Sequence, residues 1–553
     1  MKNESLLPLQ RAFLLYHLSL VFRHICPLRI LFFLSIAVKS TTTMRRIFFL
    51  SAVMLSGLFS TAQNRLGKLN IYFNNIRQTE SMNGNILLAE NGRTIYQRSF
   101  GYADFPSASE NDINVRYNLT SISKIFTSTA ILQLREKGKV QLEDTFQHYF
   151  PQFPYPDITI RHLLTHTSGL PDLELYEPLV KQFPDTIVTN DIIIPTLIKE
   201  NKPLYFNPGD KYSYCNTNYC LLAMLVEKLS GLSFSDYLQQ YIFQPARMLL
   251  TYCSKTSFQQ SQPRIATPHV IAAYYDTAYS PVFQVKRYRY TSYNNSAPTG
   301  ASNIITTTSD LQRFDLAFFG GKLLSRTSIE EALTPVRLNN GDTYWEHMDT
   351  MLGEGKGSYG LGWEIFEQPG FGKSVGHGGF MFGLATFYFR NIDRKQTIIG
   401  FDNVAGPAFG KIVTSAFYIL NDQPPMLLQI KTSLVRLFAH TMVQYGVDNA
   451  ISCLTSLKSD TSKYYFSERE MNQLGYEFLY FSSFPDHLQF AIETFKINML
   501  LFPDSYNTYD SYAEALSKAG KKQEAILMYE KSIALNPDNQ GGINALKQLL
   551  SQL

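Results

Sequence analysis

Cysteine is scarce in this chain, and no two cysteines have the spacing of a metal site. The 553 residues include five cysteines, namely Cys26, Cys215, Cys220, Cys253 and Cys453. A chain of this length can bury a sizeable core without covalent cross-links. The sequence therefore excludes a disulfide scaffold and a cysteine-ligated metal site as the basis of the fold.

An excess of charge of one sign is also missing. Lysine and arginine number 50 against 46 acidic residues, and the sequence contains no arginine-rich tract or basic stripe. Nucleic-acid-binding domains gather positive charge on one face, so we expect no nucleic-acid partner. The apolar fraction of 45% and the charged fraction of 17% are globular values, which excludes a largely disordered chain.

The beginning of the chain lacks an uninterrupted apolar run. Residues 1–43 are apolar in patches, but Arg23, His24, Pro27 and Arg29 divide them. A membrane-spanning helix needs about 20 consecutive apolar residues. We interpret this segment as an upstream leader that results from a mis-assigned start codon.

Residues 44–63 have the order of a secretory signal peptide. Two arginines precede an apolar run and then small residues, with cleavage expected near Ala62 or Gln63. Met44 is then the true start. We therefore expect an exported protein, periplasmic or extracellular. The alternative is an N-terminus that is not cleaved and anchors the protein in the membrane.

The segment 64–422 has strand patterns at both ends and helical patterns between them. Gly84–Asp104 has the pattern of two alternating strands joined by the turn Asn91–Gly92, and strand patterns return from Tyr359 to Asn403. Between them, Tyr219–Gly231 has the apolar spacing and final glycine of a helix. We expect an α/β (α+β) domain in which both ends of the segment build one antiparallel sheet, flanked by helices.

The chain becomes helical in pattern after residue 422, and it contains an internal repeat. Two stretches share landmarks at an offset of 34 residues, which is the period of tetratricopeptide repeats. The landmarks are Ala491-Ile492, Phe495 and Pro503 in the first stretch and Ala525-Ile526, Tyr529 and Pro537 in the second. We predict tetratricopeptide-like repeats over residues 466–553, preceded by a helical connector over residues 423–465.

Ser121 and Lys124 lie three residues apart at the start of an apolar helix that ends at Gly138. At this spacing two side chains point to the same side of a helix. Serine becomes a nucleophile when a base removes its proton, and lysine can be that base when its pKa is lowered. A helix N-terminus and apolar neighbours both lower it. A capping serine followed by a solvated lysine fits the same pattern, so the pair alone does not decide the function.

Two further groups of residues can likewise be functional or merely structural. Tyr214 and Asn216 lie in a turn before an apolar helix. They either place a phenol and an amide on one side of a cleft, or they are structural, with the tyrosine ring packed and the asparagine capping the helix. His377 is followed by Gly378 and Gly379 in a predicted strand. Glycines weaken a strand, so they indicate either the close approach of a ligand or a bulge.

Taken in order, the three groups resemble the active-site motifs of the serine β-lactamase and penicillin-binding-protein-like superfamily. They are Ser121-Ile122-Ser123-Lys124, Tyr214-Cys215-Asn216 and His377-Gly378-Gly379. The branch with class C β-lactamases, DD-peptidases and related esterases is the most similar. Four flanking stretches are similar as well: "ITIRHLLTHTSGLPD", "PGDKYSYCNTNYCLLAMLVEKLSG", "PTGASNIITTTSDLQRF" and "YGLGW". The resemblance covers roughly Leu66 to Asp422 and implies the fold of that superfamily for this segment.

The resemblance implies that Ser121 attacks a carbonyl and forms an acyl-enzyme. Lys124 and Tyr214 would share proton transfer, with either of them as the general base. No metal ion or organic cofactor is implied. His166, in the flank "THTSG", is interpreted as structural.

The same resemblance implies how the substrate is held. Asn216 would hydrogen-bond its acyl side, and His377, Gly378 and Gly379 would also contact it. The backbone N–H groups of the nucleophilic serine and of Phe380 would form the oxyanion hole, where one such donor lowers the barrier by about 3 kcal/mol.

His377 stands where dedicated β-lactamases carry a lysine that faces the substrate carboxylate. A histidine is charged only in part near neutrality, because its unperturbed pKa is about 6.5. The leading hypothesis is therefore an exported serine hydrolase that acts through an acyl-enzyme on an amide or ester, in the manner of DD-peptidases and esterases. A D-amino-acid-containing peptide or a small ester is the expected substrate. A true class C-like β-lactamase is the first alternative.

A protein of another class is the second alternative. It would be a non-catalytic binding protein that uses the repeats to recruit a partner. In an active enzyme the same repeats would either bind a protein or peptide partner or cap and stabilise the hydrolase domain. The sequence leaves these two roles open.

Overall fold

The computed structural model describes residues 64–182, 189–254, 264–288, 299–350, 353–428 and 431–551. The predicted leader and signal peptide lie outside the described residues. The chain divides into an N-terminal unit that ends at Tyr72 and a large unit from Phe73 to Leu553. The described residues of the first unit, 64–72, are helical. Across the described segments, no helix is both long and apolar enough to span a bilayer.

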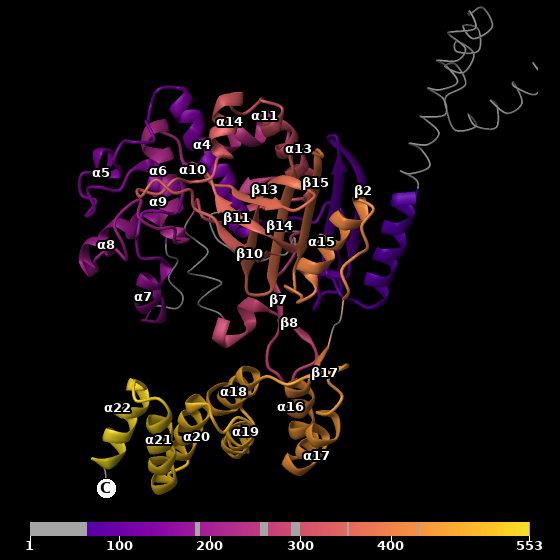
Figure 1. The fold of residues 1–553 in the computed structure, drawn as a ribbon, viewed down its shortest axis with the longest axis vertical. Coiled ribbons are helices and arrows are strands. Elements are labelled where there is room, and N and C mark those ends of the chain that lie inside the picture. The colour runs from indigo at the N-terminus through magenta and orange to yellow at the C-terminus, as the bar shows by residue number, and fades with distance from the viewer. Residues whose placement is uncertain are drawn as a thin grey trace, which may run out of the picture. The chain divides into compact units, whose positions relative to one another are not determined.

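The large unit contains an antiparallel sheet of eight strands in the order β10-β11-β12-β13-β14-β15-β1-β2 (Figure 1). The strands are β1 (Gly84–Glu90), β2 (Arg93–Phe100), β10 (Glu346–Thr350), β11 (Gly353–Tyr359), β12 (Glu364–Gln368), β13 (Gly372–Met381), β14 (Leu384–Asn391) and β15 (Gln396–Asp402). β1 pairs with β15 from Gly84↔Asp402 to Glu90↔Gln396. Both ends of the segment 64–422 therefore meet in one sheet, which confirms the predicted architecture.

The hairpin of β1 and β2 turns at Asn91 and Gly92, whose φ angles of 52° and 78° suit a tight two-residue turn. The second strand ends earlier in the structure, at Phe100, than in the sequence prediction, which extends it to Asp104. Gly101 has a φ of 61°, so the backbone changes direction there. The following residues form β3 (Tyr102–Asp104), which leaves the large sheet and pairs with β4 (Ser109–Glu110).

Helix α4 (Ser123–Glu136) belongs to the apolar cluster that runs from Leu87 to Phe401. Every residue from Ser123 to Leu134 is buried, as expected of a helix that is packed on all sides. Ser121 lies just before it, in the 3-10 turn η1 (Thr120–Ile122). The predicted single helix is thus corrected to a turn followed by a helix that begins at Ser123.

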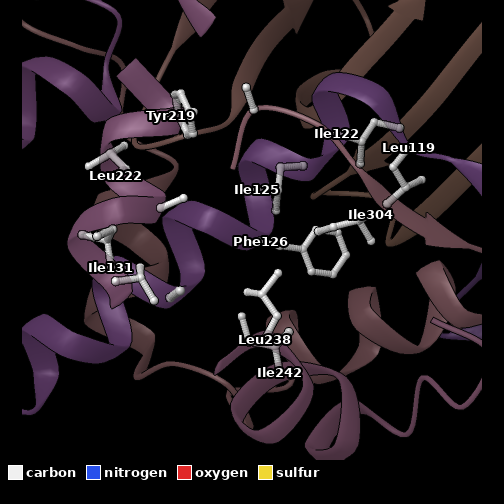
Figure 2. Packing of buried hydrophobic residues seen from close by; sticks show 14 of the residues in the cluster. Leu119, Ile122, Ile125, Phe126, Ile131, Tyr219, Leu222, Leu238, Ile242 and Ile304 are labelled. Carbon is white, nitrogen blue, oxygen red and sulfur yellow. The ribbon is translucent and has the colours of Figure 1, made fainter. Parts of the chain in front are cut away.

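Apolar side chains from η1, α4 and their neighbours meet in one cluster (Figure 2). Those labelled in the figure are Leu119, Ile122, Ile125, Phe126, Ile131, Tyr219, Leu222, Leu238, Ile242 and Ile304. Tyr219 and Leu222 come from α9 (Asn216–Ser230), the helix that the sequence predicts, which ends before Gly231. Full burial of one such side chain contributes about 1.5–3 kcal/mol, so the base of the site is rigidly packed.

Helices cover both faces of the sheet. Besides α4 and α9, the described α-helices that begin between Phe73 and Asp422 are α5 (Phe146–Tyr149), α6 (Ile160–Leu164), α7 (Glu177–Gln182), α8 (Ile193–Glu200), α10 (Phe234–Leu238), α11 (Gln244–Ala246), α13 (Thr308–Phe319), α14 (Arg326–Ala332) and α15 (Phe409–Leu420). Tyr388 of β14 donates a hydrogen bond to Asp315 of α13 at 2.8 Å. Its neighbour Phe389 packs against Phe417 of α15. Because successive side chains of a strand point to opposite faces, α13 and α15 lie on opposite sides of β14.

The C-terminal region is helical, as predicted. Its helices are α16 (Leu434–Tyr445), α17 (Val447–Leu457), α18 (Glu468–Tyr476), α19 (His487–Leu501), α20 (Tyr506–Lys518), α21 (Lys522–Leu535) and α22 (Gln540–Leu550). A short parallel pair, β16 (Thr432–Ser433) and β17 (Tyr464–Tyr465), accompanies them. One apolar cluster runs through the region from Leu434 to Leu549.

The helices follow the 34-residue offset of the sequence landmarks. α20 and α22 begin at Tyr506 and Gln540, and α19 and α21 end at Leu501 and Leu535. The paired landmarks Ala491 and Ala525 are both completely buried, where small side chains let helices pack closely. The assignment of these helices to tetratricopeptide repeats stays a prediction.

Candidate active site

Ser121 is half-buried and sits on a strained turn. Thr120, directly before it, has a φ of 49°, which a β-branched residue rarely adopts. The Thr120 N–H donates to Asn118 Oδ1 at 2.8 Å, and its hydroxyl donates to Leu119 O at 2.7 Å. The surroundings therefore hold a conformation that costs energy, a combination that clusters at functional sites.

Lys124 lies in the first turn of α4 and is completely buried. Its Nζ donates to Ser121 Oγ at 3.1 Å, to Asn216 Oδ1 at 2.8 Å and to Ala301 O at 3.1 Å. The three N–H groups of an ammonium thus meet three acceptors. The structure brings the predicted nucleophile, the predicted lysine and the predicted asparagine into one network.

Burial lowers the pKa of Lys124 to about 8, because the ammonium loses its hydration. The carboxylates of Asp172 and Glu364 act in the opposite direction and raise it. An ordinary lysine, with a pKa of about 10.4, is protonated throughout the neutral range. The lowered pKa makes a neutral amine available at mildly alkaline pH, which is what a general base requires.

Asn216 is the first residue of α9, and its amide has a fixed orientation. Its Nδ2 donates to Asp172 Oδ2 at 2.9 Å, and the Thr217 N–H donates to Asp172 Oδ1 at 3.0 Å. A carboxylate only accepts hydrogen bonds, so the amide nitrogen faces Asp172 and the amide oxygen faces Lys124. The N-cap of α9 is Cys215, whose side chain makes no capping hydrogen bond.

Tyr214 lies over the lysine, with its ring centroid 4.8 Å from Lys124 Nζ. Burial raises the pKa of Tyr214 well above its ordinary value, while a hydrogen bond with Ser121 acts in the opposite direction. His166 packs behind it with ring centroids 4.3 Å apart, and its Nδ1 accepts the Cys215 N–H at 3.1 Å. His166 is completely buried, so its contacts position the tyrosine and the backbone beside it.

His377 lies on β13 with 1% of its surface exposed. Its Nδ1 contacts Gly378 O at 2.6 Å, and its Nε2 contacts the Tyr359 hydroxyl at 3.0 Å. A carbonyl only accepts, so Nδ1 carries the proton and Nε2 accepts from Tyr359. Burial, and then the positive charge of Lys124, lower the pKa of His377 to about 3. The structure thus differs from the expected partial charge near neutrality, because the ring has lost its hydration.

The strand β13 has a free edge beside Ser121. The pairing of β12 with β13 ends at Glu364↔Gly376. Two residues further, the Gly378 N–H donates to Glu364 Oε2 at 3.0 Å along this edge. Alternate residues of a strand direct their N–H groups to the same edge, so the Phe380 N–H faces it as well. This is the orientation that an oxyanion-hole donor needs.

Gly379 allows η1 to approach β13 closely. A Cβ at this position would lie 1.9 Å from Thr120 Oγ1 and 2.6 Å from Leu119 O. The glycine therefore makes room for a turn of the same chain. This close approach places Ser121 next to the Phe380 end of the strand.

The sequence patterns single out none of three further side chains at the site, namely Asp172, Tyr359 and Glu364. Each lies in or directly after a stretch that resembles the superfamily: Asp172 ends "HTSGLPD", Tyr359 begins "YGLGW" and Glu364 follows it. Their position in these flanks is the signal that could have identified them. Their partners, however, lie far away in the chain.

The site is built from hydroxyl, amine, amide, imidazole and carboxylate groups. Among the described residues, no group of three or more His, Cys, Asp or Glu side chains is placed to hold a metal ion. The cysteines of the described segments are free thiols.

Comparison with known proteins assigns the family. A family model with the description Beta-lactamase matches residues 76–419, which is more than half of the chain. The chain belongs to this family. It is therefore a serine hydrolase of the Beta-lactamase family, and the helices from α16 onward lie beyond the matched residues.

Relatives and solved structures agree with this assignment. Penicillin-binding protein 4* of Bacillus subtilis (strain 168) is 34% identical over 344 residues, which are 62% of this chain and 72% of that protein. A penicillin-binding protein structure from Bacillus halodurans has a TM-score of 0.52 and 24% identity over 63% of this chain and 98% of that one. The D-amino acid amidase from Ochrobactrum anthropi SV3, complexed with D-phenylalanine, has a TM-score of 0.52 and 22% identity over 64% of this chain and 99% of that one. At these identities the two structures show a shared fold.

Proposed function

We propose that the protein cleaves an amide or ester bond through an acyl-enzyme on Ser121, with Lys124 as the general base. The hydrogen bonds of Lys124 Nζ carry this proposal. Of its three acceptors, Asn216 Oδ1 and Ala301 O cannot donate a proton, whereas the Ser121 hydroxyl can. When Lys124 is neutral, its two remaining N–H groups keep the bonds to Asn216 and Ala301, and its lone pair faces Ser121.

The reaction proceeds in two halves. Neutral Lys124 takes the Ser121 proton while Oγ bonds to the carbonyl carbon, and the oxyanion forms between the N–H groups of Ser121 and Phe380. The bond to the leaving nitrogen or oxygen then breaks, and that atom receives the proton through Tyr214. Water attacks the acyl-enzyme in the second half and restores Ser121.

The pKa shifts support Lys124 rather than Tyr214 as the base. The pKa of Lys124 is lowered to about 8 by burial, while burial raises the pKa of Tyr214 well above its ordinary value. The phenol therefore remains protonated where the amine is already neutral. A protonated phenol beside Ser121 is suited to pass a proton to the leaving group.

The proposed substrate is a peptide that contains D-amino acids, or a small ester. The relative named as a penicillin-binding protein and the fold shared with a D-amino acid amidase support this class. The neutral His377 supports it too, because it offers no fixed positive charge to the carboxylate of a β-lactam. Asn216 would contact the acyl side of the substrate, next to Gly379 and Phe380.

A fluorophosphonate probe tests the proposal. We expect purified protein comprising residues 64–553 to be labelled covalently and Ser121→Ala to remain unlabelled, since the probe reacts with an activated serine. Ser123→Ala is the matched control, because the Ser123 hydroxyl accepts the Ile304 N–H at 3.2 Å and is not among the acceptors of Lys124 Nζ. Labelling that persists in Ser121→Ala would remove Ser121 as the nucleophile.

Two alternatives are distinguished by further assays. Hydrolysis of a chromogenic cephalosporin at a rate above that of Ser121→Ala would support a true β-lactamase. A wild-type protein that is never labelled would support a binding protein that recruits a partner through the helices from α18 to α22. The complete network around Lys124 favours an active enzyme.

We also propose that the protein is exported by the signal peptide at residues 44–63. The hydrolase domain would then comprise residues 64–422, and the C-terminal helices would be an accessory region. Expression of the full chain from Met44 in a bacterial host, followed by N-terminal sequencing of the secreted product, tests this. A mature N-terminus near Gln63 is expected, and protein retained with an intact Met44 would contradict it.

A further inference from the structure

The acidic side chain next to the free edge of β13 has no place in the mechanism above. Resting on the proposed acyl-enzyme function, we propose that Glu364 forms a leaving-group subsite that favours an ammonium or another N–H donor and disfavours a carboxylate. The subsite belongs to the same reaction but decides which amides or esters react fastest.

Glu364 combines a fixed position with a free oxygen. It is the first residue of β12, and its Oε2 accepts the Gly378 N–H at 3.0 Å. Its Oε1 lies 3.6 Å from His377 Nδ1, but that nitrogen already contacts Gly378 O at 2.6 Å. Within the described part of the chain, Oε1 therefore keeps its acceptor capacity. The side chain is 27% exposed, so a ligand can reach it.

The distance along β13 from Gly378, which binds Glu364, to Phe380 is about the length that separates the scissile bond from the next group of the substrate. Glu364 binds the N–H of Gly378, and the proposed oxyanion donor is Phe380, two residues further on the same edge. Two residues of a strand span about 7 Å. A substrate whose carbonyl oxygen contacts the Phe380 N–H thus brings its neighbouring group toward the Glu364 carboxylate.

The leaving group, rather than the acyl group, lies on this side. Tyr214, the proposed donor to the leaving atom, has its ring centroid 6.2 Å from that of His377, the residue that precedes Gly378. Asn216, the proposed acyl-side contact, is held by Asp172 and Lys124 rather than by a residue of β12 or β13. The part of the substrate that departs is therefore directed toward Glu364.

Two charged groups of opposite sign act on Glu364. His377 is uncharged near neutral pH, because burial and the positive charge of Lys124 lower its pKa to about 3. Glu346 acts on Glu364 as a second negative charge, and Lys124 acts on it as a positive one. Lys124 must be neutral before it can act as the base, so in the enzyme form that binds a reactive substrate it does not offset the Glu364 carboxylate. A leaving group with a carboxylate is then repelled, whereas an ammonium gains a charge-assisted hydrogen bond.

Three amides of N-acetyl-D-alanine test the subsite. Their leaving groups have the same skeleton and differ in charge: D-alanine is anionic, D-alaninamide is neutral, and the monoamide of (R)-1,2-diaminopropane is cationic. We expect kcat/KM to rise in this order in the wild-type protein, by about tenfold from the anionic to the cationic substrate, as a charge-assisted hydrogen bond allows. A wild-type preference for the anionic substrate would overturn the proposal whatever the variants show.

The variant Glu364→Gln assigns the preference to this residue. It keeps an acceptor for the Gly378 N–H but removes the charge, so we expect the ratio between cationic and anionic substrates to fall to about one. Glu367→Gln is the matched control, because Glu367 is exposed on the same strand and should leave the ratio unchanged. An unchanged ratio in Glu364→Gln would overturn the proposal.

An uncharged fluorophosphonate separates failure of the subsite from failure of the proposed function. If wild-type protein is not labelled at Ser121, the acyl-enzyme function is wrong and the subsite falls with it. If wild-type protein and Glu364→Gln are labelled at similar rates, the fold and the nucleophile are intact in both. An unchanged ratio of kcat/KM between the cationic and anionic substrates in Glu364→Gln would then overturn the subsite alone.

Discussion

Asp172 Oδ2 accepts a hydrogen bond from Asn216 Nδ2 at 2.9 Å, and this bond turns the amide oxygen of Asn216 toward Lys124. The orientation of the amide decides where the lone pair of neutral Lys124 points. If the amide rotates, its NH2 group faces the amine and competes with the Ser121 hydroxyl as a donor. Asp172 is therefore a positioning residue for the base.

The variant Asp172→Asn tests this relationship. An asparagine can offer its own NH2 group to Asn216 and allow the amide to rotate, so we expect the acylation rate with a fluorophosphonate to fall about 10- to 100-fold, as for supporting residues of other sites. Asp448→Asn, in α17 outside the family-matched residues, is the control. An acylation rate equal to that of the control would contradict the assignment.

The pH dependence of kcat/KM tests the base. Burial lowers the pKa of Lys124 to about 8, and only the neutral amine can take a proton. We therefore expect kcat/KM for a neutral ester to rise with pH and to reach a plateau above pH 8, with the loss on the acid side.

Variants identify the group that titrates. Lys124→Arg should be inactive at every accessible pH, because a guanidinium does not lose its proton. Tyr214→Phe should be slower but keep the same midpoint. Glu364→Gln should retain a midpoint and shift it to lower pH, because the Glu364 carboxylate raises the pKa of Lys124. A midpoint that disappears in this variant would assign the titration to Glu364, whose pKa burial raises to about 7. A midpoint that disappears in Tyr214→Phe would assign the base to the tyrosine instead.

The buried charge cluster between α13 and the sheet predicts a stability effect. Asp315 accepts hydrogen bonds from Tyr388 Oη at 2.8 Å, Arg390 Nη1 at 2.5 Å and Thr397 Oγ1 at 3.2 Å. Its replacement by alanine leaves Arg390 nearly buried without its partner. We expect a loss of about 3–5 kcal/mol in the free energy of unfolding of the hydrolase domain, measured by urea denaturation.

An exposed ion pair provides the control for that measurement. Arg326 and Glu330 lie one helical turn apart on α14, with 91% and 66% of their side chains exposed. Glu330→Ala should change the free energy of unfolding by less than about 1 kcal/mol. Equal effects of Asp315→Ala and Glu330→Ala would show that the buried cluster does not stabilise the fold.

The sequence alone predicts those parts of the site that depend on local periodicity. The helical spacing of Ser121 and Lys124 and the alternation of residues in β13 follow from 3.6 and 2 residues per repeat. The meeting of Ser121, Tyr214 and His377 depends on contacts across some 90 to 260 residues of chain, taken from their numbers in the sequence. Local patterns contain no information on such contacts, and the resemblance to a family supplied them.

Protonation states are the part that the sequence could not provide. His377 is neutral because it is buried beside Tyr359, 18 residues earlier in the chain, and because Lys124 lies near it. The orientation of Asn216 depends on Asp172, 44 residues earlier. Burial of Lys124 was implicit in the apolar sequence of α4, but the size of the pKa shift follows from the packing around all sides of that helix.

The close approach of η1 and β13 leads to the last prediction. A methyl group at Gly379 would lie 1.9 Å from Thr120 Oγ1 and 2.6 Å from Leu119 O, so Gly379→Ala must push the turn away from the strand. The N–H groups of Ser121 and Phe380 would then no longer converge on one oxygen, and loss of one such donor lowers the rate about 100- to 1,000-fold. We expect a drop of this size in fluorophosphonate acylation, with the pH midpoint near 8 retained because Lys124 stays buried and keeps its bonds to Asn216 and Ala301. Gly406→Ala is the control, since the nearest atom to its added methyl group lies 3.6 Å away. Acylation by Gly379→Ala at the rate of this control would show that the two N–H groups do not form the oxyanion hole.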